Sequence, residues 1–321
     1  MDFELSPELK ALRARVRDFM DTHVLPVERE LFDVALRGDT SRLAELRGLA
    51  KAEGLFVPHL PVEHGGLGLG VLGMCALFRE MGRSLLGASI FNCDAPDQGN
   101  MDLLLRAASP ALRDRYFGPL ARGESTSAFC MTEPAPGAGA DPSNLRTTAT
   151  LDGDSFVIEG HKWYSTGAEG AAFLIVMART SDDPRHGATM FLVDRAAEGV
   201  EYVRDIPCLA PPLLTHREGE LKFHGVRVGP EAVLGEVGQG FQLAQARLVP
   251  ARLTHCMRWL GLADRVLQMC KLQATTRRSF GKELVHHQLV QKMFADNATA
   301  IHVGNLLTWH GASLIDKGLA K

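Results

Sequence analysis

The pattern of apolar positions divides the chain into a helical first part, a strand-rich middle and a helical last part. From Leu9 to Phe19, apolar residues recur every three or four positions, which predicts a helix with one buried face. Ser6-Pro7 suits its start, because serine caps free backbone N–H groups and proline fits the first helical position. Further helices are predicted over residues 41–53, 70–86, 96–107 and 110–121. The first part is therefore expected to be a helical bundle.

From Ser127 onward the apolar period becomes that of strands. Phe173–Met177 is a short continuous apolar run, typical of a strand buried on both faces. Asp152-Gly153-Asp154 separates two strand segments and predicts a hairpin turn. The other predicted strands cover residues 145–151, 156–159, 190–193, 200–203 and 220–223. Because no helical segment lies between them, the pattern indicates an antiparallel sheet or a small barrel.

The helical period returns after Gly240, with long helices predicted over residues 241–276 and 286–315. Helices of this length belong to bundles or oligomer contacts. Two helices alone cannot bury all of their apolar faces, so we expect this part to borrow partners from another subunit or to be incomplete. The predicted fold class is α+β multidomain: an N-terminal helical domain over 1–124, a central β domain over 125–236 and a truncated C-terminal helical domain over 237–321.

Composition and charge narrow the class of protein. The 321 residues carry a net charge of −3, which gives no electrostatic reason to bind nucleic acid or an anionic membrane. No stretch of 18 apolar residues is present, and the N-terminus resembles no secretory signal. The six cysteines lack metal-site spacing, and the adjacent His286 and His287 would point about 100° apart on a helix. We therefore expect a cytoplasmic protein without membrane insertion and without a metal site.

Gly68–Gly73 matches the dinucleotide-binding fingerprint G-x-G-x-x-G letter for letter. That fingerprint needs a strand directly before it and an acidic residue about 20 positions later. Pro58 and Pro61 interrupt the preceding segment, and no strand–helix–strand unit surrounds the glycines. The sequence therefore does not predict a Rossmann-type nucleotide site here.

One stretch marks the change from the helical to the strand pattern. Ser127–Met131 has the apolar density of a buried strand, and Glu133-Pro134 ends it. The small residues of Ala135–Asp141 allow the backbone to lie close to a flat or anionic ligand. By itself, this stretch is more typical of a loop at a domain boundary.

A second stretch, His161–Ala168, changes the interpretation of the first. Phe129–Pro134 and Lys162–Gly167 together resemble the two flavin-binding strands of the acyl-CoA dehydrogenase family. Further resemblances to motifs of that family follow its order along the chain, at residues 54–68, 233–241 and 277–288. These motifs cover nearly the whole chain, so the sequence is identified as similar to this family.

The resemblance implies FAD as cofactor and assigns residues of the middle part to the flavin ring. Phe129, Met131 and Thr132 would lie along the isoalloxazine. Tyr164 would stack near the ring, and Thr166 would place its hydroxyl near the flavin's reactive nitrogen. In the alternative interpretation, Trp163 and Tyr164 are ordinary strand residues that alternate between the two faces of a sheet.

The resemblance also implies a flavin site shared between subunits of a homodimer or homotetramer. Arg277 and Phe280 match positions that reach the cofactor of a neighbouring subunit, and arginine suits a pyrophosphate because its planar fork donates in pairs. Leu284, His287 and Gln288 match further positions near that cofactor. The alternative for Arg277-Arg278 is a solvated pair at a helix end.

The reaction implied is dehydrogenation of an acyl-CoA thioester at its α and β carbons, as in β-oxidation of fatty acids, with electrons passed to an electron-transfer flavoprotein. Arg247 matches an arginine beside the active site and substrate. Two positions depart from the family: Ala246 stands where some branches carry their catalytic glutamate, and Ala140 where a serine helps to hold a flavin phosphate. We expect the catalytic base to lie beyond residue 321.

Two other functions stay open. The missing glutamate keeps a non-catalytic or partner-dependent flavin-binding subunit or fragment in view. A flavin oxidase or monooxygenase on the same fold is the other alternative, and oxygen consumption without a carrier protein would favour it.

Overall fold

The structure is a computed structural model and describes residues 4–183, 186–209 and 217–319. The chain forms two compact units, each of which is described by itself. The first, here called the helical unit, combines Met1–Glu30, Leu43–Phe91 and Val249–Lys321. The second, the sheet unit, combines Leu31–Arg42 and Asn92–Leu248.

The helical unit contains the predicted helices of the chain's two ends. Ser6 caps the first helix as expected, since its Oγ accepts a hydrogen bond from Leu9 N at 3.2 Å. The helix predicted over 70–86 ends already at Met81, where Gly82 lies so close to α9 that a Cβ there would fall 2.2 Å from the Arg258 carbonyl oxygen. Its early elements are α1 (Pro7–Phe19), η1 (Met20–Val24), η2 (Leu25–Val27), the start of α2 (Glu28–Leu36), α3 (Ser41–Ala52), η3 (Val62–His64), α4 (Val71–Met81) and α5 (Gly87–Ile90).

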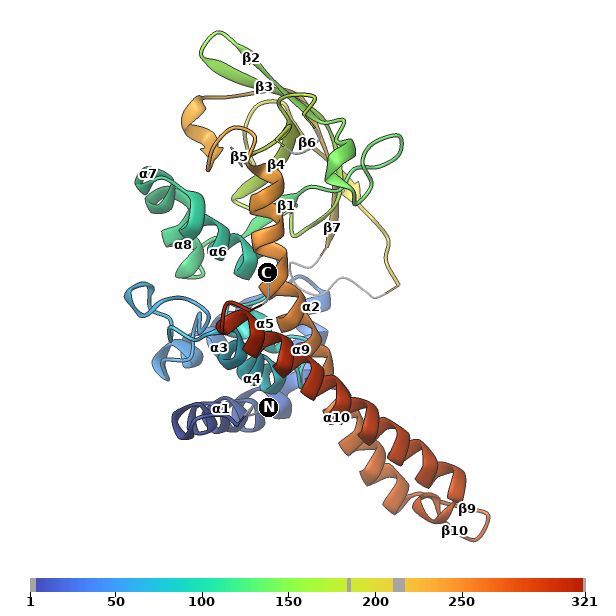
Figure 1. Ribbon diagram of the computed structural model, residues 1–321. Coiled ribbons are helices and arrows are strands. Elements are labelled where there is room, and N and C mark those ends of the chain that lie inside the picture. Colours follow the sequence, from blue (N-terminus) through green and yellow to red (C-terminus); the bar gives the residue numbers. More distant parts are fainter. Residues whose placement is uncertain (1–3, 184–185, 210–216, 320–321) are drawn as a thin grey trace. The chain divides into compact units, whose positions relative to one another are not determined.

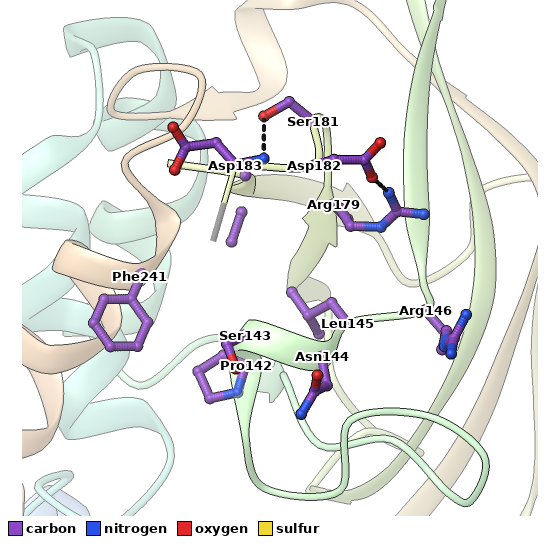
Figure 2. Close-up of a pocket in the computed structure, with 12 residues that line it drawn as sticks. Pro142, Ser143, Asn144, Leu145, Arg146, Arg179, Ser181, Asp182, Asp183 and Phe241 are labelled. Carbon is purple, nitrogen blue, oxygen red and sulfur yellow. Dashed lines mark hydrogen bonds and ion pairs between the residues drawn. The ribbon is translucent and has the colours of Figure 1, made fainter. Parts of the chain in front are cut away.

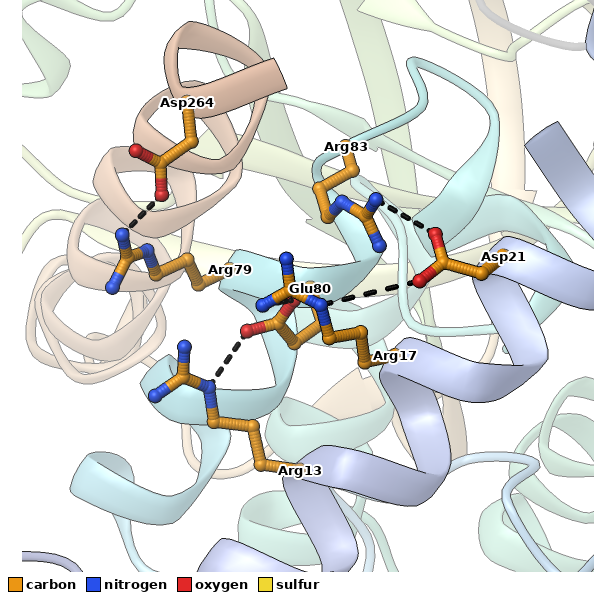
Figure 3. A network of polar contacts seen from close by, with 7 residues as sticks. All are labelled: Arg13, Arg17, Asp21, Arg79, Glu80, Arg83 and Asp264. Carbon is orange, nitrogen blue, oxygen red and sulfur yellow. Dashed lines mark hydrogen bonds and ion pairs between the residues drawn. The ribbon is translucent and has the colours of Figure 1, made fainter. Parts of the chain in front are cut away.

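A network of ion pairs joins three helices of this unit (Figure 3). Glu80 on α4 is buried and accepts a hydrogen bond from Arg13 Nε of α1 at 2.7 Å. Arg83 pairs with Asp21 at 2.7 Å, and Arg79 pairs with Asp264 of α9. A buried carboxylate is tolerated only when it is paired and hydrogen-bonded, so this network fixes how α1 and α9 lie on α4.

The glycine fingerprint at Gly68–Gly73 lies at the start of α4, and a 3-10 turn rather than a strand precedes it. Val71 N and Leu72 N donate to the Asp316 carboxylate at 2.7 and 3.0 Å. The Asp316 carboxylate therefore takes the backbone N–H groups that a dinucleotide phosphate would need. This agrees with the sequence-based interpretation that the glycines do not form a Rossmann-type nucleotide site.

The C-terminal helices form an antiparallel hairpin in which α9 (Gly240–Thr276) and α10 (Gln288–Asp316) lie side by side, with β9 (Arg278–Ser279) and β10 (Lys282–Glu283) at the tip (Figure 1). The first helix agrees with its prediction. The second begins at Gln288 rather than 286, because η7 (Leu284–His286) is a 3-10 turn and His287 is extended.

Apolar residues of the hairpin line a groove of about 700 Å³. Leu260, Leu267, Met293 and Phe294 lie on its wall, and Met269, Leu272 and Leu289 of the same hairpin are exposed. Among the described residues, no helix combines the length and the apolar character needed to cross a bilayer.

The sheet unit begins with short helices and continues as a sheet. Its helical elements are α6 (Asp97–Ala107), α7 (Pro110–Leu112), η4 (Arg113–Phe117), α8 (Gly118–Ala121), η5 (Pro142–Asn144) and η6 (Pro230–Ala232). Its strands are β1 (Ser127–Cys130), β2 (Thr148–Asp152), β3 (Ser155–Thr166), β4 (Phe173–Arg179), β5 (Ala188–Asp194), β6 (Val200–Asp205), β7 (Glu218–Val228) and β8 (Val233–Leu234).

The strands follow the order β6-β7-β3-β2-β4-β5-β8, with β1 beside β4. Most pairs are antiparallel, including the predicted β2–β3 hairpin at Gly153, but β4 pairs in parallel with both β1 and β2. The described strands thus form an open mixed sheet rather than a closed barrel. Strand β4 is buried on both faces as predicted, and its Leu174 and Val176 pack with Phe191 and Phe223 in the core.

Candidate functional site

A buried ion pair ties together the two stretches that resemble flavin-binding strands. Lys162 Nζ donates to Glu133 Oε1 at 2.8 Å and to the Met131 carbonyl at 3.0 Å. The Lys162 side chain is fully buried and that of Glu133 is 2% exposed. Trp163 N donates to the Thr132 carbonyl at 3.1 Å. The end of β1 and the end of β3 are therefore held in a fixed relation.

The Glu133 carboxylate also organises the loop that follows it. It accepts hydrogen bonds from the backbone N–H groups of Ala138, Arg146 and Thr147 at 3.1, 2.8 and 2.9 Å. Burial alone raises the pKa of Glu133, but the Lys162 charge and the donated hydrogen bonds outweigh it and lower this pKa to about 2. Burial lowers the pKa of Lys162, and Glu133 opposes that shift. Glu133 thus has a structural role in this loop.

A β-bulge at Trp163-Tyr164 presents side chains at the end of β3. The register against β7 shifts between Lys162 and Ser165, so an extra residue interrupts the alternation of faces. Tyr164 has φ 51° and is 45% exposed, whereas Lys162 is buried. Left-handed backbone is unfavourable for a large side chain, and such conformations concentrate at functional sites.

The hydroxyl of Thr166 has a carboxylate partner. Thr166 Oγ1 donates to both oxygens of Glu218, at 3.1 and 2.9 Å. The two residues face each other across the β3–β7 ladder. Sequence reasoning did not single out Glu218, since its partner lies 52 residues away and no local pattern marks the pair.

Arg247 lies on the Phe129 ring, with its guanidinium carbon 4.2 Å from the ring centroid. Its Nε donates to Asn100 Oδ1 at 3.0 Å, and Asn100 Nδ2 donates to Ser127 Oγ at 2.9 Å. Burial lowers the pKa of Arg247 to about 10. Burial also raises the pKa of nearby Asp102 to about 6, although Arg247 opposes the shift. Arg247 is thus a half-buried cation in contact with Phe129 of β1.

The remaining predicted residues gather at the tip of the α9–α10 hairpin, in the helical unit. Phe280 has φ 50° and is 95% exposed, and its ring lies 6.4 Å from that of His287. Arg278 Nη2 donates to the Gly281 carbonyl at 2.9 Å, whereas the contacts of Arg277 among the described residues are made by its backbone. Leu284 lines the apolar groove, and Gln288 is exposed at the start of α10.

A pocket of about 310 Å³ opens on the sheet unit beside the loop that Glu133 organises (Figure 2). Its wall carries two arginines, Arg146 and Arg179, and the exposed ring of Phe241 at the start of α9. Arg179 is already paired with Asp182. The other lining residues are Pro142, Ser143, Asn144, Leu145, Ser181, Asp183, Gly187 and Ala188.

The residues at the ends of β1 and β3 fit a flat, uncharged ring. Met131, Thr132, Trp163 and Thr166 are half-buried and Tyr164 is exposed, so their side chains remain accessible at strands whose backbones are fixed. Threonine hydroxyls supply polar contacts for the edge of such a ring. Among the residues that the structure describes, no group of three or more His, Cys, Asp or Glu side chains is placed to hold a metal ion.

The chain is similar to known proteins along its whole length. Models of the acyl-CoA dehydrogenase N-terminal, middle and C-terminal domains match residues 6–124, 128–223 and 238–321. FadE2 of Mycobacterium tuberculosis, named as an acyl-CoA dehydrogenase, is 37% identical over 99% of this chain and 79% of its own length.

Two further matches, one curated protein and one solved structure, are also named as acyl-CoA dehydrogenases. Acyl-CoA dehydrogenase family member 11 of Rattus norvegicus is 36% identical over 94% of this chain and 40% of its own length. The chain thus spans about two fifths of the first curated relatives that it matches. A solved structure from Mycobacterium abscessus, assigned to the acyl-CoA dehydrogenases, covers 98% of this chain and 82% of its own at 34% identity, with a TM-score of 0.93. The chain therefore belongs to the acyl-CoA dehydrogenase family.

Proposed function

We propose that this chain binds FAD non-covalently and serves the dehydrogenation of an acyl-CoA thioester between its α and β carbons. The observation that carries the proposal is the buried Lys162–Glu133 pair, which holds the ends of β1 and β3 together while leaving their aromatic and hydroxyl side chains accessible. A bound flavin supplies the hydride acceptor that no side chain provides.

In this proposal, Phe129, Met131 and Thr132 lie along the flavin ring, Tyr164 stacks near it, and the Thr166 hydroxyl faces its reactive nitrogen. The Arg247 guanidinium lies on Phe129 and is fixed by Asn100. A half-buried cation beside the site would stabilise negative charge that develops on the flavin or on the thioester.

The flavin site is completed by a second copy of the chain. Arg277 and Phe280 expose a guanidinium and an aromatic ring at the hairpin tip of the helical unit. A guanidinium suits the FAD pyrophosphate, and Leu284, His287 and Gln288 would lie near the same cofactor. The apolar groove of the hairpin supports self-association as a homodimer or homotetramer.

The pocket lined by Arg146 and Phe241 is proposed to receive part of the CoA moiety. Coenzyme A carries phosphates, which a guanidinium binds, and an adenine, which an aromatic ring can stack on. Arg146→Ala should weaken binding of CoA esters by about tenfold, equivalent to the loss of about 1.4 kcal/mol of a charge-assisted contact. Retention of full affinity would remove the pocket from the proposal.

Binding of product tests the function without requiring proton transfer. FAD-loaded protein should change its visible flavin absorbance when titrated with long-chain 2-enoyl-CoA, and free CoA should compete. A flavin spectrum that no acyl-CoA or enoyl-CoA perturbs would refute the proposed substrate class.

The catalytic base is proposed to come from beyond residue 321, because Ala246 offers no carboxylate. A proton next to a thioester needs a base within about 3 Å in order to leave. Residues 1–321 alone should therefore bleach bound FAD very slowly when mixed anaerobically with short to long acyl-CoAs. Rapid bleaching would show that the base lies within these residues.

The acceptor of the electrons is proposed to be a flavoprotein carrier of the electron-transfer type. Stoichiometric oxygen consumption without a carrier would instead favour an oxidase or monooxygenase.

A further inference from the structure

We propose that Glu218 orients the hydroxyl of Thr166, so that Thr166 faces the bound flavin as a hydrogen-bond acceptor rather than as a donor. The inference rests on the proposed function in one respect, the position of the flavin's N5 beside Thr166. It assigns Glu218 as a positioning residue, a role that acts on the flavin through Thr166.

The contact between the two side chains is built into the sheet. Thr166 and Glu218 are opposite each other in the antiparallel β3–β7 ladder, and the hydroxyl donates to both carboxylate oxygens, at 3.1 and 2.9 Å. Gly167 N donates to the Arg217 carbonyl at 2.9 Å, and Ile206 N to the Glu218 carbonyl at 2.7 Å. Strands on both sides therefore hold the backbone of Glu218 in place.

The chemistry of the pair fixes the direction of the hydroxyl proton. An ionised carboxylate only accepts hydrogen bonds, and a threonine hydroxyl has one proton and two acceptor lone pairs. The proton of Thr166 is therefore directed to Glu218, and a lone pair is left for any other partner. A hydrogen bond to an ionised acceptor is stronger than one between neutral groups. The Thr166 hydroxyl therefore continues to donate to Glu218 when a neutral flavin nitrogen is nearby.

The orientation discriminates between the two redox states of a flavin. Oxidised N5 carries a lone pair and needs a donor, whereas a reduced flavin carries an N–H at this position and needs an acceptor. Thr166, oriented by Glu218, hydrogen-bonds the reduced state only. The negative charge of Glu218 acts in the opposite direction, because it disfavours additional negative charge nearby.

A double-mutant cycle separates these two effects, since the charge acts with or without the hydroxyl. The FAD-loaded full chain is compared with Glu218→Gln, Thr166→Val and the double variant, and the equilibrium constant for flavin reduction is measured against a redox dye at fixed pH. In the Thr166→Val background, Glu218→Gln removes only the charge, so the constant should rise. With Thr166 present, Glu218→Gln also frees the hydroxyl proton of Thr166, which can then be donated to N5 of the oxidised flavin. The rise of the equilibrium constant should therefore be at least tenfold smaller, which corresponds to about 30 mV for a two-electron couple.

Controls distinguish orientation from loss of structure. Glu201→Gln alters an exposed carboxylate of β6 that pairs with His224 at 2.7 Å, and it should show no coupling to Thr166. Thr166→Ser keeps the hydroxyl and should reproduce the wild-type response to Glu218→Gln. If Thr166→Val loses FAD, Thr166→Ala takes its place in the cycle.

Additive effects of Glu218→Gln and Thr166→Val, within twofold, would overturn the inference. Such additivity in protein that retains FAD would leave the proposed function standing. Wild-type protein without FAD would instead contradict the proposed function itself.

Discussion

Removal of Lys162 tests the contact on which the candidate site depends. Lys162→Met keeps an unbranched apolar stem but leaves Glu133 as a buried carboxylate without its cation. Breaking one side of a buried ion pair costs about 3–5 kcal/mol. Three backbone N–H groups still donate to Glu133, so we expect the lower end, about 3 kcal/mol.

The pKa of Glu133 gives the pH range over which this contact stabilises the fold. Its folded value of about 2 lies below the ordinary 4.5. Burial opposes ionisation of Glu133, and the Lys162 charge and the donated hydrogen bonds outweigh it. Because the folded pKa is the lower one, this stabilisation is complete above pH 4.5 and is lost as the pH falls towards 2.

The assay is urea unfolding of the wild type, Lys162→Met, Glu133→Gln and the double variant, with FAD content measured in parallel. The double variant should lose less than the sum of the single changes, with a coupling of about 1–3 kcal/mol. Arg227→Met, which breaks an exposed ion pair with Asp152 in the same sheet, should cost less than about 1 kcal/mol. A loss below 1 kcal/mol for Lys162→Met, with full FAD retention, would refute the reasoning.

Three further expectations concern the cofactor, the assembly and the response to acid. Arg277→Ala should weaken FAD binding by about 1.5–3 kcal/mol. Arg278→Ala should weaken it less, because Arg278 donates to the Gly281 carbonyl within the turn. Equal FAD content of the two variants after dialysis would mean that Arg277 does not contact the cofactor. Light scattering at micromolar concentration should show dimers or tetramers, because the hairpin groove is apolar, and a folded monomer would contradict the shared site. Burial lowers the pKa of His59 to about 3, and both of its ring nitrogens lack a hydrogen-bond partner among the described residues. The unfolded chain takes up this proton below pH 6.5, so the stability advantage of His59→Phe should grow by about 2 kcal/mol between pH 8 and pH 5, and a constant difference in urea unfolding would contradict this.

Local pattern was sufficient to predict the elements that carry the site. The period of apolar residues predicted α9 over nearly its whole length, and Gly153 predicted the β2–β3 hairpin. Both signals depend only on residues that are near one another in the sequence. The early end of α4 could not be predicted in this way. Gly82 ends that helix where α9, more than 170 residues later, lies against it, and no local signal encodes such an approach.

The same limit applies to the candidate site. Motif resemblance pointed to Thr166, Phe129 and Arg247 one by one, but it did not predict the contact of Arg247 with Phe129. Glu218 was missed, because the β3–β7 pairing brings it to Thr166 from 52 residues away. The parallel pairing of β1 with β4 was missed for a similar reason: β1 joins the sheet after α8, and the apolar pattern of a strand does not reveal the direction of its neighbour. The three-domain division remains a prediction.

The most direct test of the central proposal is the identity of the flavin that the chain retains. Protein purified without added cofactor is denatured, and the released chromophore is separated and quantified. The flavin-site proposal predicts FAD, released without proteolysis and approaching one equivalent per chain in the oligomeric fraction. Release of FMN would contradict the proposal. So would folded protein that releases no flavin and that takes up none when FAD is added.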